Sequence, residues 1–170
     1  MQYKKINSEV LYAEGPVVKT DRRDILALKR GAGAGARKRM RLCAHMDVRD
    51  KVHEMLIVLK KGVYIRPHRH LEKSESFHVI EGRADIFVFG DKGEIVEKIP
   101  MGDYASGRKF FYRISAPFYH TVLVRSAFFA FHETTNGPFR KAATSAAPWA
   151  PDESDAAAAG KFMRRLGASK

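Results

Sequence analysis

Two histidines and a glutamate are the residues of this sequence best placed to do chemistry. Within Gly62–Gly82, His68 and His70 are separated by one residue, and Glu75 follows five positions after His70. Alternate side chains of a β-strand share a face, so the two imidazoles would lie about 6.6 Å apart. Both can then reach one cation, because a Zn–N bond is only about 2.0–2.1 Å long. Imidazole with carboxylate, and no thiolate, suits a divalent first-row metal.

Two glycines complete the pattern around these residues. Gly62, the His/Glu set and Gly82 follow the spacing G-x5-H-x-H-x4-E-x6-G, and a short reversal over Glu72–Ser74 would bring Glu75 beside the histidines. This run resembles the first conserved motif of the cupin superfamily at all five positions. The resemblance implies a double-stranded β-helix that holds a metal. The alternative is a solvated loop that is rich in Lys, Arg and His by chance.

The resemblance to cupins also implies a third histidine from a second motif, P-x-G-x-x-H-x3-N. The best position is His120, which opens an apolar, β-branched stretch. The rest of that motif is not conserved here, since Ser115, Pro117 and Val124 stand where it has Pro, Gly and Asn. His120 is therefore the expected third ligand. The competing histidine, His132, is interpreted as a structural residue of a strand.

The metal would be one divalent first-row transition metal, with Zn, Fe, Mn and Ni all compatible with a His/Glu site. Neither the ligand types nor their spacing selects among the four. No catalytic residue is assigned from the sequence.

Short strands separated by turn signals fill the middle of the chain. The Gly90–Gly93 segment is a hairpin turn of the Gly/Asp type, and Gly82 is expected to close one strand with a turn. Many short strands with Gly-rich turns favour a sandwich or barrel. The expected strands are 54–60, 63–70, 74–80, 83–89, 94–99, 110–115, 120–125 and 127–133. With the His/Glu motif, the prediction is an all-β fold: a double-stranded β-helix, the cupin jelly roll, with a short N-terminal helix and a C-terminal tail.

Three segments are expected along the chain. Residues 1–50 would form an N-terminal arm with the short helix and a Gly/Ala linker. Residues 51–135 would form the metal-binding barrel, and residues 136–170 an Ala- and Pro-rich tail with a helix near its end. At 170 residues the chain is long enough for one domain with a sizeable core.

The N-terminal helix is expected to begin at Asp21 or Asp24, either of which can cap it, and to end at Arg30. Gly31–Ala36 alternates Gly and Ala and is expected to be a flexible linker. The C-terminal helix would run from Asp152 to about Leu166, although its short length makes it marginal.

The chain is strongly basic, with 31 Lys and Arg against 19 Asp and Glu and a net charge of +12. Six of the basic residues lie in Lys29–Arg41, which has no acidic residue and no aromatic one for base stacking. A solvated basic face is the first interpretation, binding of a small anion the second, and nucleic acid the least favoured. The lone Cys43, the lack of an apolar leader and apolar runs too short to span a bilayer predict a cytoplasmic protein without a membrane span.

Two residues upstream of the H-x-H pair are candidates for ligand binding. If the strand continues back from His68, then Arg66 and Tyr64 share its inward face. The Arg66 guanidinium would hold a carboxylate or phosphate, and Tyr64 would donate a hydrogen bond or act as an acid. The alternative, held about evenly, is that Arg66 pairs with an internal acid and Tyr64 only packs.

A narrower resemblance covers residues 6 to about 151. Arg39-Met-Arg41, Tyr64–His70, Gly137-Pro and Ala147–Pro151 look like the WbuC-type cupin-fold metalloproteins. That family occurs with bacterial polysaccharide (O-antigen) biosynthesis genes, which hints at a sugar-derived, anionic ligand. The resemblance to cupins also implies a homodimer.

Two functions follow from these expectations. The first is a metal-dependent enzyme of the isomerase or epimerase kind, or, with iron, a dioxygenase. The second is a non-catalytic protein that binds a metal and a ligand. The enzyme is weakly favoured.

Overall fold

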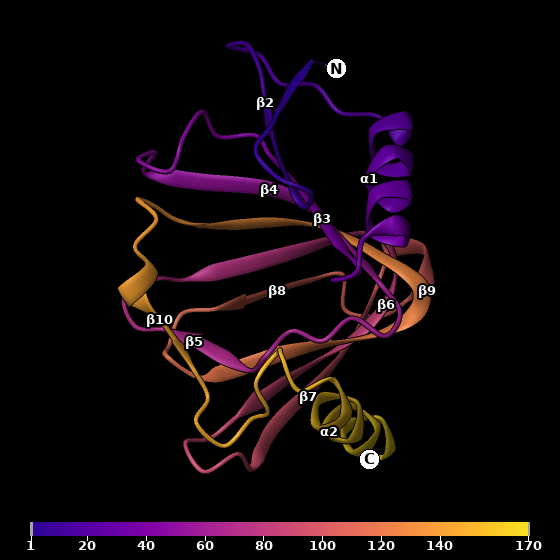
Figure 1. Cartoon of the computed structure of the whole chain (residues 1–170), viewed down its shortest axis with the longest axis vertical. Helices are drawn as coiled ribbons and strands as arrows, with labels where there is room; N and C mark the ends of the chain where they lie inside the picture. Colours follow the sequence, from indigo (N-terminus) through magenta and orange to yellow (C-terminus); the bar gives the residue numbers. More distant parts are fainter. Residues whose placement is uncertain (1, 170) are drawn as a thin grey trace.

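The computed structural model describes residues 2–169, except for the side chain of Lys141, and is dominated by β-strands (Figure 1). The strands are β1 (Tyr3–Lys5), β2 (Val10–Ala13), β3 (Arg39–Cys43), β4 (Val52–Lys60), β5 (His68–His70), β6 (Glu75–Phe89), β7 (Ile95–Gly102), β8 (Phe111–Ile114), β9 (Tyr119–Asn136) and β10 (Thr144–Ala146). The helices are α1 (Arg22–Ala34) and α2 (Ala156–Ala168), with 3₁₀ turns at Tyr104–Ser106 and Lys141–Ala143. Neither α1 nor α2 is long and apolar enough to cross a membrane.

The two longest strands, β6 and β9, run antiparallel and pair from Glu75–Thr135 to Phe89–Tyr119. Their pairing is interrupted by bulges between Val79 and Glu81 and between Gly82 and Ala84. Bulges bend a strand and increase its twist. The pair therefore crosses from one layer of the fold to the other.

Different strands join the two halves of this central pair. In one layer, β8 flanks β6, while β4, β3, β2 and β1 follow β9 in that order. In the other layer, β7 flanks β6, while β5 and then β10 follow β9. Apolar side chains from both layers form one buried cluster: Leu59, Val63, Phe77, Val79, Ala84, Ile86, Met101, Tyr112, Val122, Val124, Phe129 and Phe131. The predicted all-β jelly roll is confirmed, with a sheet that is not closed into a complete barrel.

The bend at Gly82 differs from the sequence prediction of a turn between two strands. Gly82 has φ of +89°, and a Cβ at this position would lie 2.2 Å from the carbonyl oxygen of Phe128. The strand therefore continues through Gly82 because only glycine allows β9 to approach so closely. Ser126 supports the same bend, since its hydroxyl accepts a hydrogen bond from the Arg83 amide at 2.8 Å.

Helix α1 packs on the outer face of the first layer. Of the two caps that the sequence allows, Asp21 is the one in the structure, in a capping box with Asp24. The helix does not end at Arg30, however, and most of the expected Gly/Ala linker is its last turn. Ala32 is fully buried, and a Cβ at Gly31 would meet Met40 at 2.8 Å. Small residues here let the helix lie close to β3, so packing overrides the weak helix propensity of the glycines.

The chain ends are also more integrated than the predicted arm and tail. Strands β1, β2 and β3 extend the first layer, and β10 pairs with β5 in the second. Helix α2, capped by Asp155, packs Phe162 and Leu166 against Phe87 and Phe89 on the outer face of the second layer. Strand pairing therefore extends well beyond residues 51–135.

Candidate metal site

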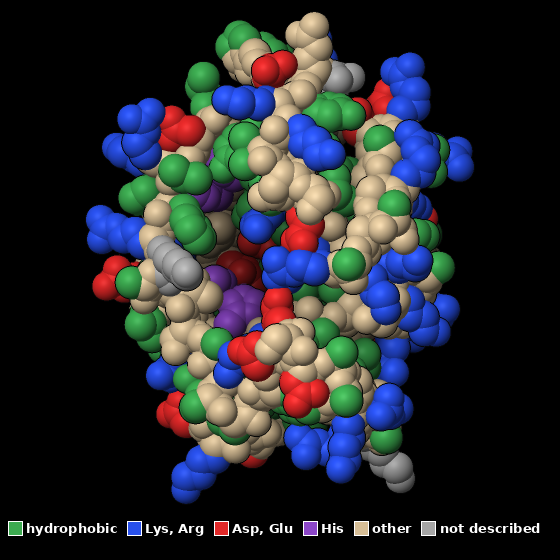
Figure 2. All heavy atoms as spheres, viewed as in Figure 1, with side chains coloured by type: hydrophobic (Ala, Val, Ile, Leu, Met, Phe, Trp, Pro, Cys, Tyr) green, Lys and Arg blue, Asp and Glu red, His purple; other side chains and the backbone are tan. Residues whose placement is uncertain are grey.

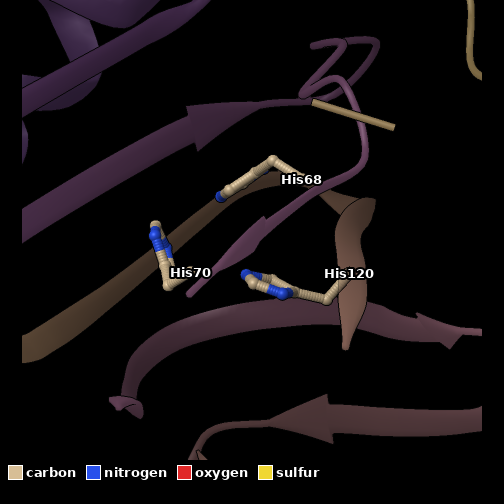
Figure 3. A group of neighbouring side chains, drawn as sticks. All are labelled: His68, His70 and His120. Atoms are coloured by element: carbon tan, nitrogen blue, oxygen red, sulfur yellow. The ribbon is translucent and has the colours of Figure 1, made fainter. Parts of the chain in front are cut away.

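Three histidines converge between the two layers, as Figure 3 shows. His68 and His70 extend from β5, and His120 extends from β9 directly opposite His68 in the strand register. One ring nitrogen from each lies within 4.8 Å of the other two. Such a group can hold a metal ion, because the nitrogens surround a common point from three directions.

Backbone carbonyls orient two of these rings. Nδ1 of His68 lies 3.0 Å from the Arg66 carbonyl oxygen, and Nδ1 of His120 lies 3.1 Å from that of Phe118. A carbonyl oxygen can only accept, so each Nδ1 carries the proton and donates. The lone pair of each neutral ring is then on Nε2, which is the arrangement of metal-binding histidines.

Glu75 lies beside the third ring and is almost fully buried, with 3% exposed. Its Oε2 is 3.1 Å from Nε2 of His70, whose Nδ1 is 3.1 Å from the Thr144 hydroxyl. Its Oε1 accepts a hydrogen bond of 3.1 Å from the Tyr112 hydroxyl. The carboxylate thus adds oxygen donors to the nitrogen set, while Thr144 and Tyr112 hold it and His70 in place.

Nε2 of His120 is the clearest sign that a cation fits among these residues. This nitrogen is buried and lies 3.0 Å from Oε1 of Glu75 without a well-formed hydrogen bond. A buried polar atom without a partner is costly. A cation held between the nitrogen and the carboxylate would satisfy both.

Burial and mutual charge shift the pKa values of the group. Burial alone would raise the pKa of Glu75, but the nearby His120, His70 and His68 hold it well below its usual value. Burial, followed by repulsion from His120, lowers the pKa of His68 to about 4. For His120, burial lowers the pKa, but attraction to Glu75 outweighs it and raises the value. An ionised carboxylate and a neutral His68 are the forms that bind a metal.

The site opens into a cavity of about 800 Å³, a volume typical of small-molecule sites. Figure 2 shows this face hollowed, with histidine side chains along the wall and acidic atoms deep inside. Apolar side chains dominate the lining, and its polar part is made by His68, His70, His120, Glu75, Glu133, Thr121, Thr135, Thr144, His45, His53, Arg39, Arg41 and Lys73, among others.

Glu133 is a cavity residue that the sequence interpretation missed. In the register it lies opposite Met55 and Phe77, and therefore diagonal to Glu75. Burial, followed by repulsion from Glu75, raises the pKa of Glu133 to about 8. Inward positions of β9 switch from even to odd residue numbers at its bend, so simple alternation from His120 could not have found Glu133.

His45 and His53, also on the cavity wall, stack face to face at 4.0 Å between ring centres. Their rings are nearly parallel, at 7°. The pair presents ring faces rather than converging nitrogens, so we interpret it as wall structure. His132, in contrast, lies outside the cavity lining, with Nε2 3.8 Å from Oε1 of Glu54.

Arg66 and Tyr64 do not line the cavity, contrary to the interpretation from strand parity. Arg66 pairs with Asp152 at 2.7 Å and donates to the Ala147 carbonyl at 3.2 Å. Tyr64 donates to the Pro151 carbonyl at 2.8 Å, and burial raises its pKa to about 12. Parity fails because β5 begins only at His68, and the chain before it is not a strand. Both residues instead hold the C-terminal segment. The alternative interpretation is also met only in part, because Asp152 is an exposed acid rather than an internal one and Tyr64 donates a hydrogen bond.

Part of the chain matches one family of proteins. Residues 20–101, just under half of the chain, match the profile of a domain of unknown function (DUF6016). No curated protein matches the sequence.

Three solved structures are similar to part of this chain. Protein SO0799 from Shewanella oneidensis is 15% identical with a TM-score of 0.49, over 61% of this chain and 66% of that one. A Bacillus subtilis oxalate decarboxylase variant is 17% identical with a TM-score of 0.47, over 57% and 24%. Procruciferin, an 11S globulin from Brassica napus, is 14% identical with a TM-score of 0.46, over 56% and 22%. The chain spans less than two thirds of each, and these similarities do not identify its function.

Proposed function

We propose that this protein binds one divalent first-row transition metal through His68, His70, His120 and Glu75. The observation that carries the proposal is the arrangement of the rings: two Nδ1 atoms are anchored on carbonyls, while the Nε2 atoms of His70 and His120 lie 3.1 and 3.0 Å from a buried carboxylate. Zn, Fe, Mn and Ni all accept such ligands, and geometry alone does not choose among them.

We further propose that a small anionic ligand occupies the cavity beside the metal. Four protein ligands leave one or two positions free on a five- or six-coordinate ion. A metal with a free position can polarise a carbonyl or lower the pKa of bound water. Glu133, half-buried on the cavity wall, is the protein group placed to accept or donate a proton there.

A metal-dependent isomerase or epimerase is the favoured form of this activity. A non-catalytic binding protein and an iron-dependent dioxygenase are the alternatives. A sugar-derived ligand and a role in polysaccharide (O-antigen) biosynthesis rest only on the resemblance to WbuC-type proteins. The resemblance to cupins in general is the support for a homodimer, and a cytoplasmic location rests on sequence composition.

The experiment is a thermal-shift series with metal-loaded and chelator-treated protein. Nucleotide sugars, sugar phosphates and small carboxylates are added in turn, because a ligand that binds only the folded protein raises the melting temperature. We expect at least one anionic compound to raise it, and more so when metal is present. Turnover of that compound that ends on chelation supports the enzyme, and a shift without turnover supports the binding protein. No shift with any anion in either form contradicts the ligand proposal.

A further inference from the structure

Arg41 lies on the cavity face of β3. It is opposite Ile57 in the register, and both residues line the cavity. Its sequence neighbours Met40 and Leu42 are buried on the other face, in the cluster beneath α1. Strand alternation therefore directs the Arg41 side chain toward the cavity.

Arg41 differs from nearby arginines because no carboxylate of the described residues lies within salt-bridge distance of it, although Glu133 is near enough for a charge interaction. Arg37 and Arg39 both pair with Glu9, at 3.4 and 2.9 Å, and with Glu153, at 2.5 and 3.6 Å. Arg39 is the other arginine of the cavity lining. Its charge is already matched by these two glutamates.

Among the described residues, the one side-chain hydrogen bond of the Arg41 guanidinium goes to Sδ of Met55, at 4.0 Å from Nη1. A thioether is a weak acceptor, so most of the five N–H donors of the guanidinium are available to a ligand. Lys73, another cation of the lining, places its ammonium 5.8 Å from the ring centre of Phe139. Arg41 is thus the cavity cation best able to offer a planar pair of donors.

The surface between Arg41 and the histidines is largely apolar. Met55 lies opposite Glu133 and is one inward position along β4 from Ile57. It extends the apolar surface toward the metal site. Phe131, opposite Ile57, and Phe77, opposite Glu133, extend it across β9 and β6. A ligand that reaches both Arg41 and the metal site must place an apolar body on these side chains.

We propose that Arg41 holds the carboxylate of an amphipathic ligand, whose apolar body lies along Met55, Ile57 and Phe131 toward the metal site. A guanidinium matches the two oxygens of a carboxylate with two parallel hydrogen bonds. The single positive charge of one guanidinium matches a singly charged carboxylate better than a doubly charged phosphate. The inference deepens the proposed function, because it names the ligand class for the same cavity.

The test uses hexanoate and its neutral analogue hexanamide as probes, with binding measured by isothermal titration calorimetry. The wild-type chain is compared with R41Q and with R37Q, which removes an equally charged arginine that does not line the cavity. Each protein is measured after metal loading and after chelation. R41K serves as a second variant, since it keeps the charge and loses the planar fork.

We expect wild type and R37Q to bind hexanoate more tightly than hexanamide, with or without metal. In R41Q the affinity for hexanoate should fall about tenfold and match that for hexanamide, and in R41K it should fall several-fold. A preference for hexanoate that persists in R41Q and disappears on chelation would place the carboxylate on the metal and overturn the role of Arg41. Equal binding of both probes by the wild type would overturn it as well. A chain that takes up no metal but keeps the Arg41-dependent preference would contradict the metal proposal alone.

Discussion

At the scale of single residues, the metal site depends on groups that hold its ligands as much as on the ligands. Tyr112 donates to Oε1 of Glu75, and Thr144 lies at Nδ1 of His70. Such partners fix the orientation of a ligand before the metal arrives. Without the Tyr112 hydroxyl, Oε1 of Glu75 would be a buried oxygen that accepts no hydrogen bond.

Replacing Tyr112 by Phe keeps the ring and removes only this hydroxyl. We expect the affinity for metal to fall about 10- to 100-fold, which is the usual effect of losing a partner of a metal ligand. Competition with a chromophoric chelator measures the affinity. Tyr104→Phe is the control, because Tyr104 is 80% exposed and does not line the cavity. Equal affinities of the two variants would contradict the positioning role.

Glu133 gives a prediction for stability against pH. Its pKa is raised from 4.5 to about 8, so the folded chain binds this proton more tightly than the unfolded chain. The unfolded chain therefore loses the proton first, and stability falls as the pH rises from about 4.5 through about 8. Repulsion from Glu75 also raises the pKa of Glu133, whereas Arg41 and His120 lower it.

The variant Glu133→Gln cannot ionise and should escape that loss. In metal-free protein we expect it to be more stable than wild type at pH 8.5, with the difference shrinking toward pH 5. Urea unfolding at both values gives the free energies. The same difference in free energy of unfolding between variant and wild type at both pH values would show that Glu133 has an ordinary pKa.

At the scale of elements, the bent pair of β6 and β9 brings the site together. One end of β6 supplies Glu75, and the start of β9 supplies His120 beside β5. The bend depends on Gly82, where a Cβ would clash with the Phe128 carbonyl. The placement of the metal ligands therefore depends on a close backbone contact at Gly82. This contact lies in the bend and not in the metal site.

Gly82→Ala and Gly107→Ala form a matched pair for this bend. Both glycines have positive φ, but a Cβ at Gly107 would meet no atom within 4 Å. We expect Gly107→Ala to cost about 1–2 kcal/mol from backbone strain alone. Gly82→Ala should cost clearly more, and unfolding by urea would measure both. Equal costs would contradict the role of close packing at Gly82.

The elements also show what the sequence could and could not predict. His68, His70, Glu75 and His120 are brought together as expected, because the H-x-H pair is on a strand and its spacing to Glu75 is local. Strand parity places Arg66 wrongly, because the segment before His68 is not a strand. Glu133 and Arg41 depend on register between strands distant in sequence, which a pattern within one segment cannot reveal.

At the scale of the whole molecule, the net charge of +12 remains its most unusual property. The basic segment Lys29–Arg41 is not a flexible arm, since it runs through α1 and β3. Several of its charges pair with Glu9, Glu81 and Glu153. A partly neutralised, ordered surface without an aromatic platform suits diffuse attraction of anions.

Any binding of single-stranded DNA should therefore depend on salt and not on sequence. We expect the affinity of mixed-sequence oligonucleotides to fall steeply between 50 and 200 mM salt, since counterion release dominates such binding. Fluorescence anisotropy at several salt concentrations measures the slope. A complex that is insensitive to salt and selective for one sequence would instead make nucleic acid a specific partner.

The most direct test of the central proposal is the metal content of the purified chain. Inductively coupled plasma mass spectrometry is applied to wild type, to the double variant His68→Ala/His70→Ala, and to His132→Ala, whose histidine lies outside the cavity lining. We predict close to one divalent first-row metal per chain in wild type and in His132→Ala, and almost none in the double variant. Full metal content in a folded double variant would contradict the assignment of this site.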